Sequence, residues 1–453
     1  MERFARTYLQ NWKNKPNRKP LVIRGARQVG KTELVRIFAK QEFKNLVEIN
    51  FDETPGKASL FQDDDVHNIL RFIEIGANDR IEPGETLLFL DEIQAFPGVF
   101  AKLRYFYEKI PTLHVICAGS LLDFTLAEPE FSLPVGRIEF LHLGPMSFEE
   151  FLMASGHEKL RDYLCSFVLP QSIPAAIHDQ LLGKLREYSI VGGLPGVIKA
   201  YLESNRNPQT LIQEQQGILQ TYYLDFGKYK KRVNVASLQV VFRKLPPQIG
   251  KTIKYSALDP EQKSRHVKEN LDLLEKARLI YRVFHSDANG LPLGSEVNER
   301  CFKLVFLDVG LLNTLLGIRE TDLVLAKDIV LVHSGAVAEQ LVGQALLYGG
   351  NPYAEPSLYY WNRPERGSTA ELDYLIQSRG RILPVEVKAG NTGRLKSLQT
   401  FIQEKNAPIG IRFNSDPPSV YETRTAVAGK EPRRFTLLSL PLYLAEQLQR
   451  LLD

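Results

Sequence analysis

Cysteine is scarce in this chain: Cys117, Cys165 and Cys301 are the only three among 453 residues, and they lie far apart. This spacing indicates neither a metal-ligand cluster nor a disulfide framework, and a reducing cytoplasm is the expected setting. The eight histidines show no zinc-type spacing. No apolar run approaches the roughly 18 residues of a membrane span, and the first twenty residues lack the apolar stretch of a signal peptide. We therefore expect a cytoplasmic protein with no membrane partner.

The overall composition indicates an ordinary globular protein but does not predict which molecule it binds. Hydrophobic residues make up 44% and charged residues 24% of the chain, as in an ordinary globular protein. At about 100–200 residues per domain, a chain of 453 residues is expected to form two to four domains. The net charge of +4 is too small to predict a nucleic-acid partner by itself. Local clusters of charge are more informative.

The first 145 residues alternate short apolar runs with amphipathic stretches, a pattern typical of a parallel sheet covered by helices. The runs are dense in Leu, Val, Ile and Phe, as expected for strands buried on both faces. Helical periodicity follows in Phe148–Ala154 and from Leu160 to Tyr201. The predicted strands are Leu21–Arg24, Leu46–Phe51, Leu87–Leu90, Leu113–Ala118 and Ile138–Leu143.

The segment Gly25-Ala-Arg-Gln-Val-Gly-Lys-Thr32 has the full G-x-x-x-x-G-K-[ST] pattern of a phosphate-binding loop. It lies directly after a predicted strand and before the predicted helix Glu33–Lys40. Its glycines allow backbone N–H groups to surround phosphate oxygens, and the helix N-terminus adds favourable partial charge. Lys31 is expected to reach the β and γ phosphates of ATP, and Thr32 to ligate Mg²⁺. The predicted ATP-binding residues are Gly25, Ala26, Arg27, Gln28, Val29, Gly30, Lys31 and Thr32.

A second motif supports nucleotide hydrolysis. The apolar strand Leu87–Leu90 runs into Asp91 and Glu92, the pattern of a Walker B motif. Asp91 is expected to hold the magnesium ion through water, and Glu92 to orient and deprotonate the attacking water. Paired with the phosphate-binding loop, the two acids indicate an ATPase rather than a passive nucleotide-binding protein.

Two further polar residues are candidates for catalysis. Ser120 follows the fourth predicted strand, where it either contacts the γ-phosphate or the attacking water, or belongs to a simple turn. Arg137 precedes the fifth strand, where it is either a surface residue or a finger that reaches a neighbouring subunit's ATP. The finger interpretation predicts a homo-oligomer, with a hexamer as one form, that holds nucleotide at its subunit interfaces.

These motifs resemble those of the AAA+ ATPases, and more closely those of a large, poorly characterised prokaryotic family of such ATPases. The segment Val191-Gly-Gly-Leu-Pro195 resembles the lid motif of signal-transduction (STAND-type) ATPases, which implies that Pro195 lies beside the nucleotide. A helix-breaking turn is the alternative reading of this segment. Besides the two ATP motifs, the resemblance is carried by Ala118–Ser120, Gly136–Arg137, Pro145–Phe151, Val191–Pro195 and Lys303–Leu312.

Residues 235–310 resemble a winged helix-turn-helix. Ser264–Lys276 is the predicted recognition helix, with Ser264 as its cap. Two strands, Leu279–Phe284 and Phe302–Phe306, flank the polar loop Ser286–Arg300. Basic residues near this helix suit a DNA backbone, although a solvated basic surface or a protein-interaction module fits them too. The candidate DNA contacts are Lys228, Lys230, Lys231, Arg232, Lys263, Arg265 and Lys268.

The C-terminal region carries a second chemical signature after the predicted helix Ala336–Leu347. Asp373 lies in one strand. Glu386 follows thirteen residues later in the next strand and Lys388 two residues after that, which is the pattern D-x₁₂-E-x-K. Period two places the last two side chains on one face of their strand. Paired carboxylates can hold a hard metal ion, and a lysine can activate water.

This arrangement resembles the PD-(D/E)XK restriction-endonuclease-like fold. The resemblance implies metal binding by Glu339, Asp373 and Glu386, and catalysis by Asp373, Glu386 and Lys388. Either the domain cuts DNA, or it is a degenerate nuclease fold that only binds.

Taken together, the sequence predicts an α/β protein in four parts. These are an AAA+ ATPase core with a parallel sheet (1–145), a helical lid (146–215), a winged-helix domain (216–325) and a restriction-endonuclease-like domain (326–453). The leading hypothesis is an ATP- and Mg²⁺-dependent ATPase that acts on DNA, with a nuclease or branched-DNA processing activity left open. The rivals are a STAND-like nucleotide switch whose C-terminal domain binds DNA or a protein, and a protein-remodelling ATPase.

Overall fold

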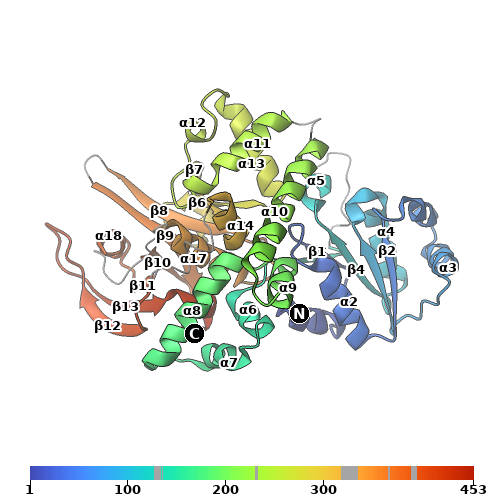
Figure 1. Ribbon diagram of the computed structural model, residues 1–453, viewed down its shortest axis with the longest axis horizontal. Helices are drawn as coiled ribbons and strands as arrows, with labels where there is room; N and C mark the ends of the chain where they lie inside the picture. The colour runs from blue at the N-terminus through green and yellow to red at the C-terminus, as the bar shows by residue number, and fades with distance from the viewer. Residues whose placement is uncertain are drawn as a thin grey trace. The chain divides into compact units, whose positions relative to one another are not determined.

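The computed structural model describes residues 1–126, 134, 136–229, 233–317, 335–365, 368–388 and 395–452 (Figure 1). The chain forms two compact units. The first contains Met1–Pro145 with two short later segments, Lys276–Arg278 and Asn351–Glu355, and the second contains the remainder of the chain. None of the helices in the described part has the length and apolar content that a membrane span requires.

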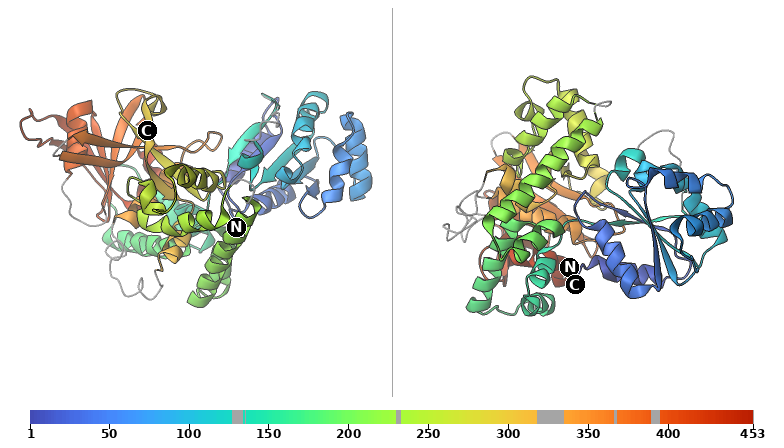
Figure 2. Two further views of the ribbon diagram at one scale, coloured as in Figure 1. Left: turned by 90° about the horizontal axis from the view of Figure 1, so that it is seen from above. Right: turned by 45° about the vertical axis from the view of Figure 1, so that its right-hand side comes forward.

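The first unit is an α/β layer structure. Its strands are β1 (Leu21–Arg24), β2 (Asn45–Asn50), β3 (Thr86–Asp91), β4 (His114–Gly119) and β5 (Glu139–His142). Its helices are α1 (Ala5–Lys13), α2 (Lys31–Glu42), α3 (Val66–Ala77), α4 (Gly98–Lys109) and α5 (Leu122–Leu126), with short 3₁₀ turns η1 (Pro55–Phe61) and η2 (Ile93–Ala95). Figure 2 shows helices on both faces of this sheet.

The five strands pair in parallel in the order β2-β3-β4-β1-β5. The central strands β3 and β4 are buried along their whole length, which explains their continuous apolar sequence. Because β1 lies between β4 and β5, the loop that follows it emerges at the carboxyl edge of the sheet, beside the end of β4. The predicted parallel P-loop sheet is therefore confirmed.

The second unit begins with helices. They are α6 (Phe148–Ala154), α7 (Glu158–Ser166), α8 (Ala175–Val191), α9 (Pro195–Glu203), α10 (Pro208–Asp225), α11 (Val235–Lys244), α12 (Tyr255–Leu258) and α13 (Ser264–Lys276), with the turns η3 (Phe226–Tyr229) and η4 (Pro246–Gln248). The antiparallel hairpin of β6 (Ile280–Ser286) and β7 (Val297–Phe306) follows, with η5 (Leu293–Glu296) between its strands.

After α14 (Val309–Leu315) and α17 (Ala336–Tyr348), the second unit completes a mixed sheet. Its eight strands run in the order β12-β13-β11-β10-β9-β8-β6-β7. The added strands are β8 (Leu358–Glu365), β9 (Ser368–Ser378), β10 (Arg381–Val387), β11 (Ile409–Asn414), β12 (Ser419–Arg424) and β13 (Arg434–Pro441). Among the described residues, the other helical segments of this unit are α18 (Lys396–Lys405), η6 (Leu442–Gln447) and α19 (Leu448–Leu452).

The β6–β7 hairpin is continuous with the C-terminal sheet, because β6 pairs in parallel with β8 through Val283–His285. The sheet thus crosses residue 325, where we placed a domain boundary. The boundary itself stays a prediction. The strands on its two sides are nevertheless hydrogen-bonded in one sheet. The predicted loop Ser286–Arg300 is also shorter than expected, since β7 already begins at Val297. Asn298, Glu299 and Arg300 of β7 are polar and exposed, so the start of this strand shows no apolar periodicity in the sequence.

Asp308 joins two sequence motifs of the second unit, Val191–Pro195 and Lys303–Leu312. This side chain is 1% exposed and caps α14 by accepting from the backbone N–H of Leu311 at 3.0 Å. Its other oxygen accepts from the N–H of Gly193 at 2.6 Å. Gly192 has φ +78°, and a Cβ there would lie 2.2 Å from the Asp308 carboxylate. Glycine at position 192 of the Val191–Pro195 motif is therefore required by this close approach.

We expect Asp308→Ala to destabilise the second unit by roughly 3 kcal/mol, because two buried N–H groups would lose their acceptor. Asn207→Ala is the matched control: it removes an exposed cap of α10 and should cost only about 1 kcal/mol. Urea denaturation followed by Trp361 fluorescence in a Trp12→Phe background reports on this unit, since Trp12 lies in the first unit. Equal losses in the two variants would contradict the role of Asp308.

Candidate nucleotide site and acidic cluster

The predicted phosphate-binding loop joins β1 to α2, as the sequence indicated. Gly30 has φ +87° and precedes the first residue of α2. A Cβ at Gly25 would lie 2.3 Å from the Leu143 carbonyl oxygen, so only glycine fits there. The loop thus leads into the N-terminus of a twelve-residue helix, where backbone N–H groups have no intrahelical acceptor.

Lys31 is folded back onto its own loop. Its side chain is buried, and its ammonium donates to the carbonyl oxygens of Gly25 at 3.0 Å and Ala26 at 2.8 Å. Burial lowers the pKa of Lys31 to about 8, although the neighbouring Glu92 and Asp91 partly oppose this shift. An incoming anion would replace the two carbonyl partners and favour the charged form.

Thr32 and Asp91 form the part of the site that suits magnesium. The Thr32 hydroxyl donates to the Asp91 carboxylate at 2.8 Å. Burial raises the pKa of Asp91, an effect that the Thr32 hydrogen bond opposes. A hydroxyl and a buried carboxylate at the carboxyl edge of the sheet are hard oxygen donors, which Mg²⁺ prefers. The residues present therefore fit a magnesium ion held beside bound phosphates.

Glu92, the predicted general base, follows Asp91 in a left-handed backbone conformation with φ +48°. Its carboxylate accepts hydrogen bonds from the Gln94 amide and from the Ser120 hydroxyl, the latter at 3.2 Å. Ser120 also accepts from Arg27 Nε at 3.3 Å. The structure thus brings Glu92 and Ser120 together with a loop arginine. Gln94 was missed in the sequence, although it lies only two residues after Glu92.

Arg137 and Pro195 lie elsewhere. Arg137 precedes β5, at the end of the strand opposite to the phosphate-binding loop, and its side chain pairs with Glu108 at 2.7 Å. A role as a finger on a partner's ATP stays a prediction. Pro195 is the first residue of α9 in the second unit, and its contact with nucleotide likewise stays a prediction.

Within the first unit, an ion-pair cluster lies beside the loop that sequence reasoning did not find. Arg24, just before the loop, pairs with Asp123 of α5 and with Glu355. Arg278, which is buried, pairs with Asp123 and Glu355 at 2.7 Å each. The members are spread over more than three hundred residues, so no spacing rule could have joined them.

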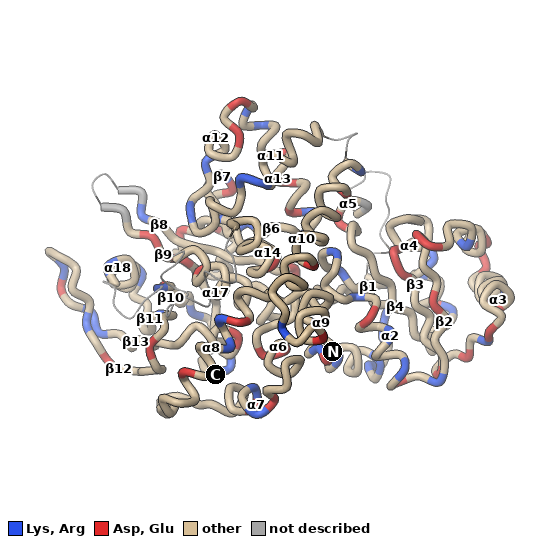
Figure 3. The backbone as a smooth tube through the Cα atoms, in the orientation of Figure 1, with Lys and Arg blue, Asp and Glu red and all other residues tan. Residues whose placement is uncertain are grey.

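The described candidate DNA contacts lie on exposed positions. Arg265 is 86% exposed and pairs with Glu269, and Lys228 pairs with Asp225. Lys263 and Lys268 are also exposed near the start of α13. Acidic residues lie among the basic ones along α11–α13 (Figure 3). Lys230, Lys231 and Arg232 lie outside the described residues.

The structure gathers the predicted nuclease residues into one acidic cluster. Glu339 comes from α17, Asp373 from β9 and Glu386 from β10. Burial, followed by the nearby Asp373 charge, raises the pKa of Glu339 to about 8 and that of Glu386 to about 7. Lys388 forms an ion pair with Glu386.

An unpredicted residue, Lys303 of β7, lies inside the same cluster. Its ammonium is within ion-pair distance of Glu339, Glu371 and Asp373. A lone lysine within the apolar run Cys301–Leu307 was the available signal, because lysine is almost never fully buried without partners.

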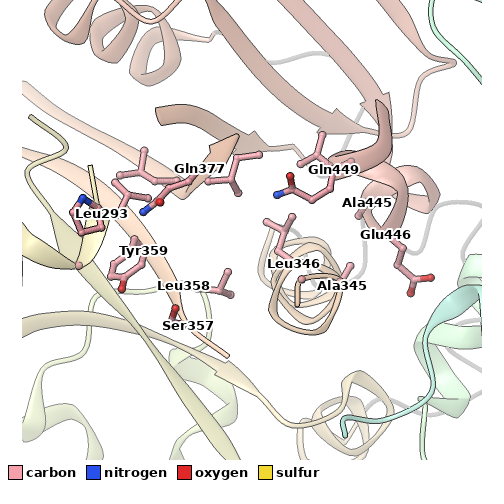
Figure 4. Close-up of a pocket in the computed structure, with 17 residues that line it drawn as sticks. Leu293, Ala345, Leu346, Ser357, Leu358, Tyr359, Gln377, Ala445, Glu446 and Gln449 are labelled. Atoms are coloured by element: carbon pink, nitrogen blue, oxygen red, sulfur yellow. The ribbon is translucent and has the colours of Figure 1, made fainter. Parts of the chain in front are cut away.

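A pocket of about 340 Å³ lies in the second unit (Figure 4). Leu346 and Leu358 face its interior, and the amides of Gln377 and Gln449 lie on one side. Glu446 lines the pocket, but its carboxylate accepts from the N–H groups of Phe148 and Glu149 at the start of α6. The labelled lining thus combines apolar groups with amides, hydroxyl groups and the engaged carboxylate of Glu446.

A match to a known protein family agrees with the fold of the first unit. Residues 17–152 match the AAA domain family. Residues 182–322 and 334–443 match two domains of unknown function, DUF8612 and DUF4143. No curated relative matches the sequence.

Solved structures give more distant likenesses. The Walker-type ATPase PABY2304 of Pyrococcus abyssi is 14% identical, with a TM-score of 0.44 over 69% of this chain and 95% of that one. The RuvB Holliday junction branch migration motor of Thermotoga maritima is 14% identical, with a TM-score of 0.29 over 65% and 90% of the two chains. The Orc1 protein of Aeropyrum pernix in complex with DNA is 12% identical, with a TM-score of 0.27 over 69% and 90%.

The family match and the geometry of Lys31, Thr32 and Asp91 lead to the same conclusion. A lysine at a helix N-terminus, a hydroxyl bonded to a strand-end carboxylate and an adjacent glutamate are the parts that nucleotide hydrolysis requires. Residues 17–152, which match the AAA domain family, have the geometry of a P-loop ATPase site.

Proposed function

We propose that this chain is an ATP- and Mg²⁺-dependent ATPase that acts on DNA through its second unit. The observation that carries the proposal is the 2.8 Å hydrogen bond between Thr32 and Asp91, with Glu92 as the next residue. This hydrogen bond supports the proposal because Thr32 and Asp91, the pair we propose for the metal, lie beside the phosphate-binding loop, and Glu92, the proposed base, is the next residue.

In the proposed hydrolysis, different side chains of this chain have different roles. Lys31 exchanges its two loop carbonyl partners for phosphate oxygens, which neutralises part of the phosphate charge. Bound Mg²⁺, held by Thr32 and Asp91, would supply further neutralisation of that charge. Glu92 orients the attacking water and accepts its proton, once it gives up the hydrogen bonds from Gln94 and Ser120.

Support for DNA as the partner comes from α11–α13 and the β6–β7 hairpin. Three helices followed by an antiparallel hairpin are the element order of a winged helix. The inner face of α13 is buried through Val267, Leu271 and Leu274, which leaves its basic residues outside. A helix exposed in this way can contact phosphates with its first turns.

A nucleotide switch is the second candidate, and the state of Glu92 favours it. Its carboxylate is already held by Gln94 and Ser120, so water activation requires those bonds to break. Slow turnover would follow. ATP turnover with and without linear, branched and single-stranded DNA separates the two functions. DNA stimulation supports the DNA-acting ATPase, whereas a slow rate that DNA leaves unchanged supports the switch.

Glu92→Gln should lower ATP turnover by roughly 10²- to 10⁴-fold while nucleotide binding persists, because the amide cannot accept the proton of the attacking water. Turnover is measured by phosphate release and binding by fluorescent ATP titration. Glu53→Gln, an exposed change in the same unit, is the control and should match the parent. Full turnover in Glu92→Gln would rule out this residue as the base.

ATP binding should take up a proton at alkaline pH. With a pKa of about 8, Lys31 of the free protein is about three-quarters neutral at pH 8.5, and bound phosphates restore its charge. Affinity for ATP should therefore fall as the pH rises through about 8. Titration calorimetry in two buffers with different ionisation enthalpies measures the uptake. Lys31→Arg, which stays charged, should show none of it. Equal uptake in the two proteins would refute the depressed pKa.

Changing Lys263, Arg265 and Lys268 together to alanine should weaken DNA binding and reduce the slope of log affinity against log salt by about 2–3. Each lost phosphate contact removes nearly one unit of slope. Fluorescence anisotropy with duplex DNA at several salt concentrations measures both quantities. Lys159 of α7 and Lys199 of α9, which are exposed cations outside α11–α13, are changed together as the control. Similar losses in control and triple variant would argue against α13 as the DNA-binding element.

A further inference from the structure

Lys303 is the centre of the acidic cluster in the second unit. Its side chain is 1% exposed, and its ammonium lies 3.0 Å from Glu339 Oε1, 2.7 Å from Glu371 Oε1 and 3.4 Å from Asp373 Oδ1. Burial lowers the pKa of Lys303, but the carboxylates of Glu339, Asp373 and Glu371 outweigh it and hold that pKa above its ordinary value. The lysine is therefore a permanent cation in the interior.

Two further carboxylate oxygens of the cluster also have partners. Asp373 Oδ2 accepts from the backbone N–H of Val387 at 2.7 Å. One oxygen of Glu386 pairs with the Lys388 ammonium, and the other is buried without a hydrogen-bond partner among the described residues. Glu339 Oε2 would lie 2.8 Å from a Cβ at Gly250, so this side is closely packed.

A divalent metal does not fit this donor set. It would need the oxygens of Glu339 and Asp373 at about 2.0–2.6 Å, which is the space between them that the Lys303 ammonium takes. Two cations in one buried site also repel strongly, because the interior screens charge poorly. Within the described ranges no group of three acidic, histidine or cysteine residues has a geometry that could hold a metal ion.

We propose that Lys303 is the resident cation of this cluster, so that the C-terminal fold holds no catalytic metal and does not cut DNA. The ammonium replaces the metal's charge and joins β7 to α17 and β9. This inference narrows the proposed function to an ATPase whose C-terminal fold serves as a binding element. It rests on the geometry of the second unit alone.

The first test counts bound Mn²⁺ on the nucleotide-free full chain by electron paramagnetic resonance, for the parent and for Asp373→Asn. We expect equal counts, because the cluster contributes no metal site in either protein. Supercoiled plasmid incubated with the parent and Mn²⁺ should remain intact. One additional Mn²⁺ in the parent, or nicking that Lys388→Ala abolishes, would overturn the proposal.

The second test removes the resident cation. Lys303→Gln leaves Glu339, Glu371, Asp373 and Glu386 with one lysine, and it should gain about one Mn²⁺ and an unfolding temperature that Mn²⁺ raises by a few degrees. Lys251→Gln, an exposed change in the same unit, should show neither effect. A folded Lys303→Gln protein that binds no additional Mn²⁺ would contradict the replacement of metal by lysine.

If Lys303→Gln does not fold, the comparison of the parent with Asp373→Asn still decides the proposal. The metal count uses protein without nucleotide, so its result is independent of ATP turnover. A nuclease-active parent that also hydrolyses ATP would reject this inference alone. A parent without turnover and without metal at the cluster would reject the ATPase proposal alone.

Discussion

A charge buried in a protein interior must be neutralised by partners, and both functional regions of this chain follow from that constraint. In the first unit, Lys31 is held by loop carbonyls, which are weak partners for an ammonium. In the second unit, Lys303 is held by three carboxylates, which are strong ones. The first lysine is free to exchange its partners for phosphate, whereas the second has no stronger partner to gain.

The need to neutralise buried charge also explains the surroundings of the buried acidic residues. Asp91 is buried beside a hydroxyl and a lysine, so its environment suits an incoming metal and phosphate. Glu339 and Glu386 are buried near Asp373, and burial, followed by the Asp373 charge, raises the pKa of each above its ordinary value. A site of this kind resembles a metal centre in sequence because it uses the same carboxylates.

Backbone geometry positions the rest of each site. Gly25 and Gly30 allow the phosphate-binding loop to approach Leu143 and turn into α2. Gly192 allows the Val191–Pro195 segment to meet Asp308, which joins two motifs that the sequence presents as separate. In both places a missing side chain lets a backbone segment approach an oxygen that a Cβ would displace.

The sequence by itself determined the parallel sheet, the phosphate-binding loop and the Asp91–Glu92 pair, because these depend on local periodicity and on residues close in the chain. It also predicted that Asp373, Glu386 and Lys388 belong to neighbouring strands. Only the tertiary structure decided that Lys303 enters their cluster and that β6 joins the C-terminal sheet. Those contacts link residues about seventy or more apart, and no spacing rule relates such positions. Tertiary packing determines which groups lie beside a buried charge, and the spacing of residues in the sequence does not show this.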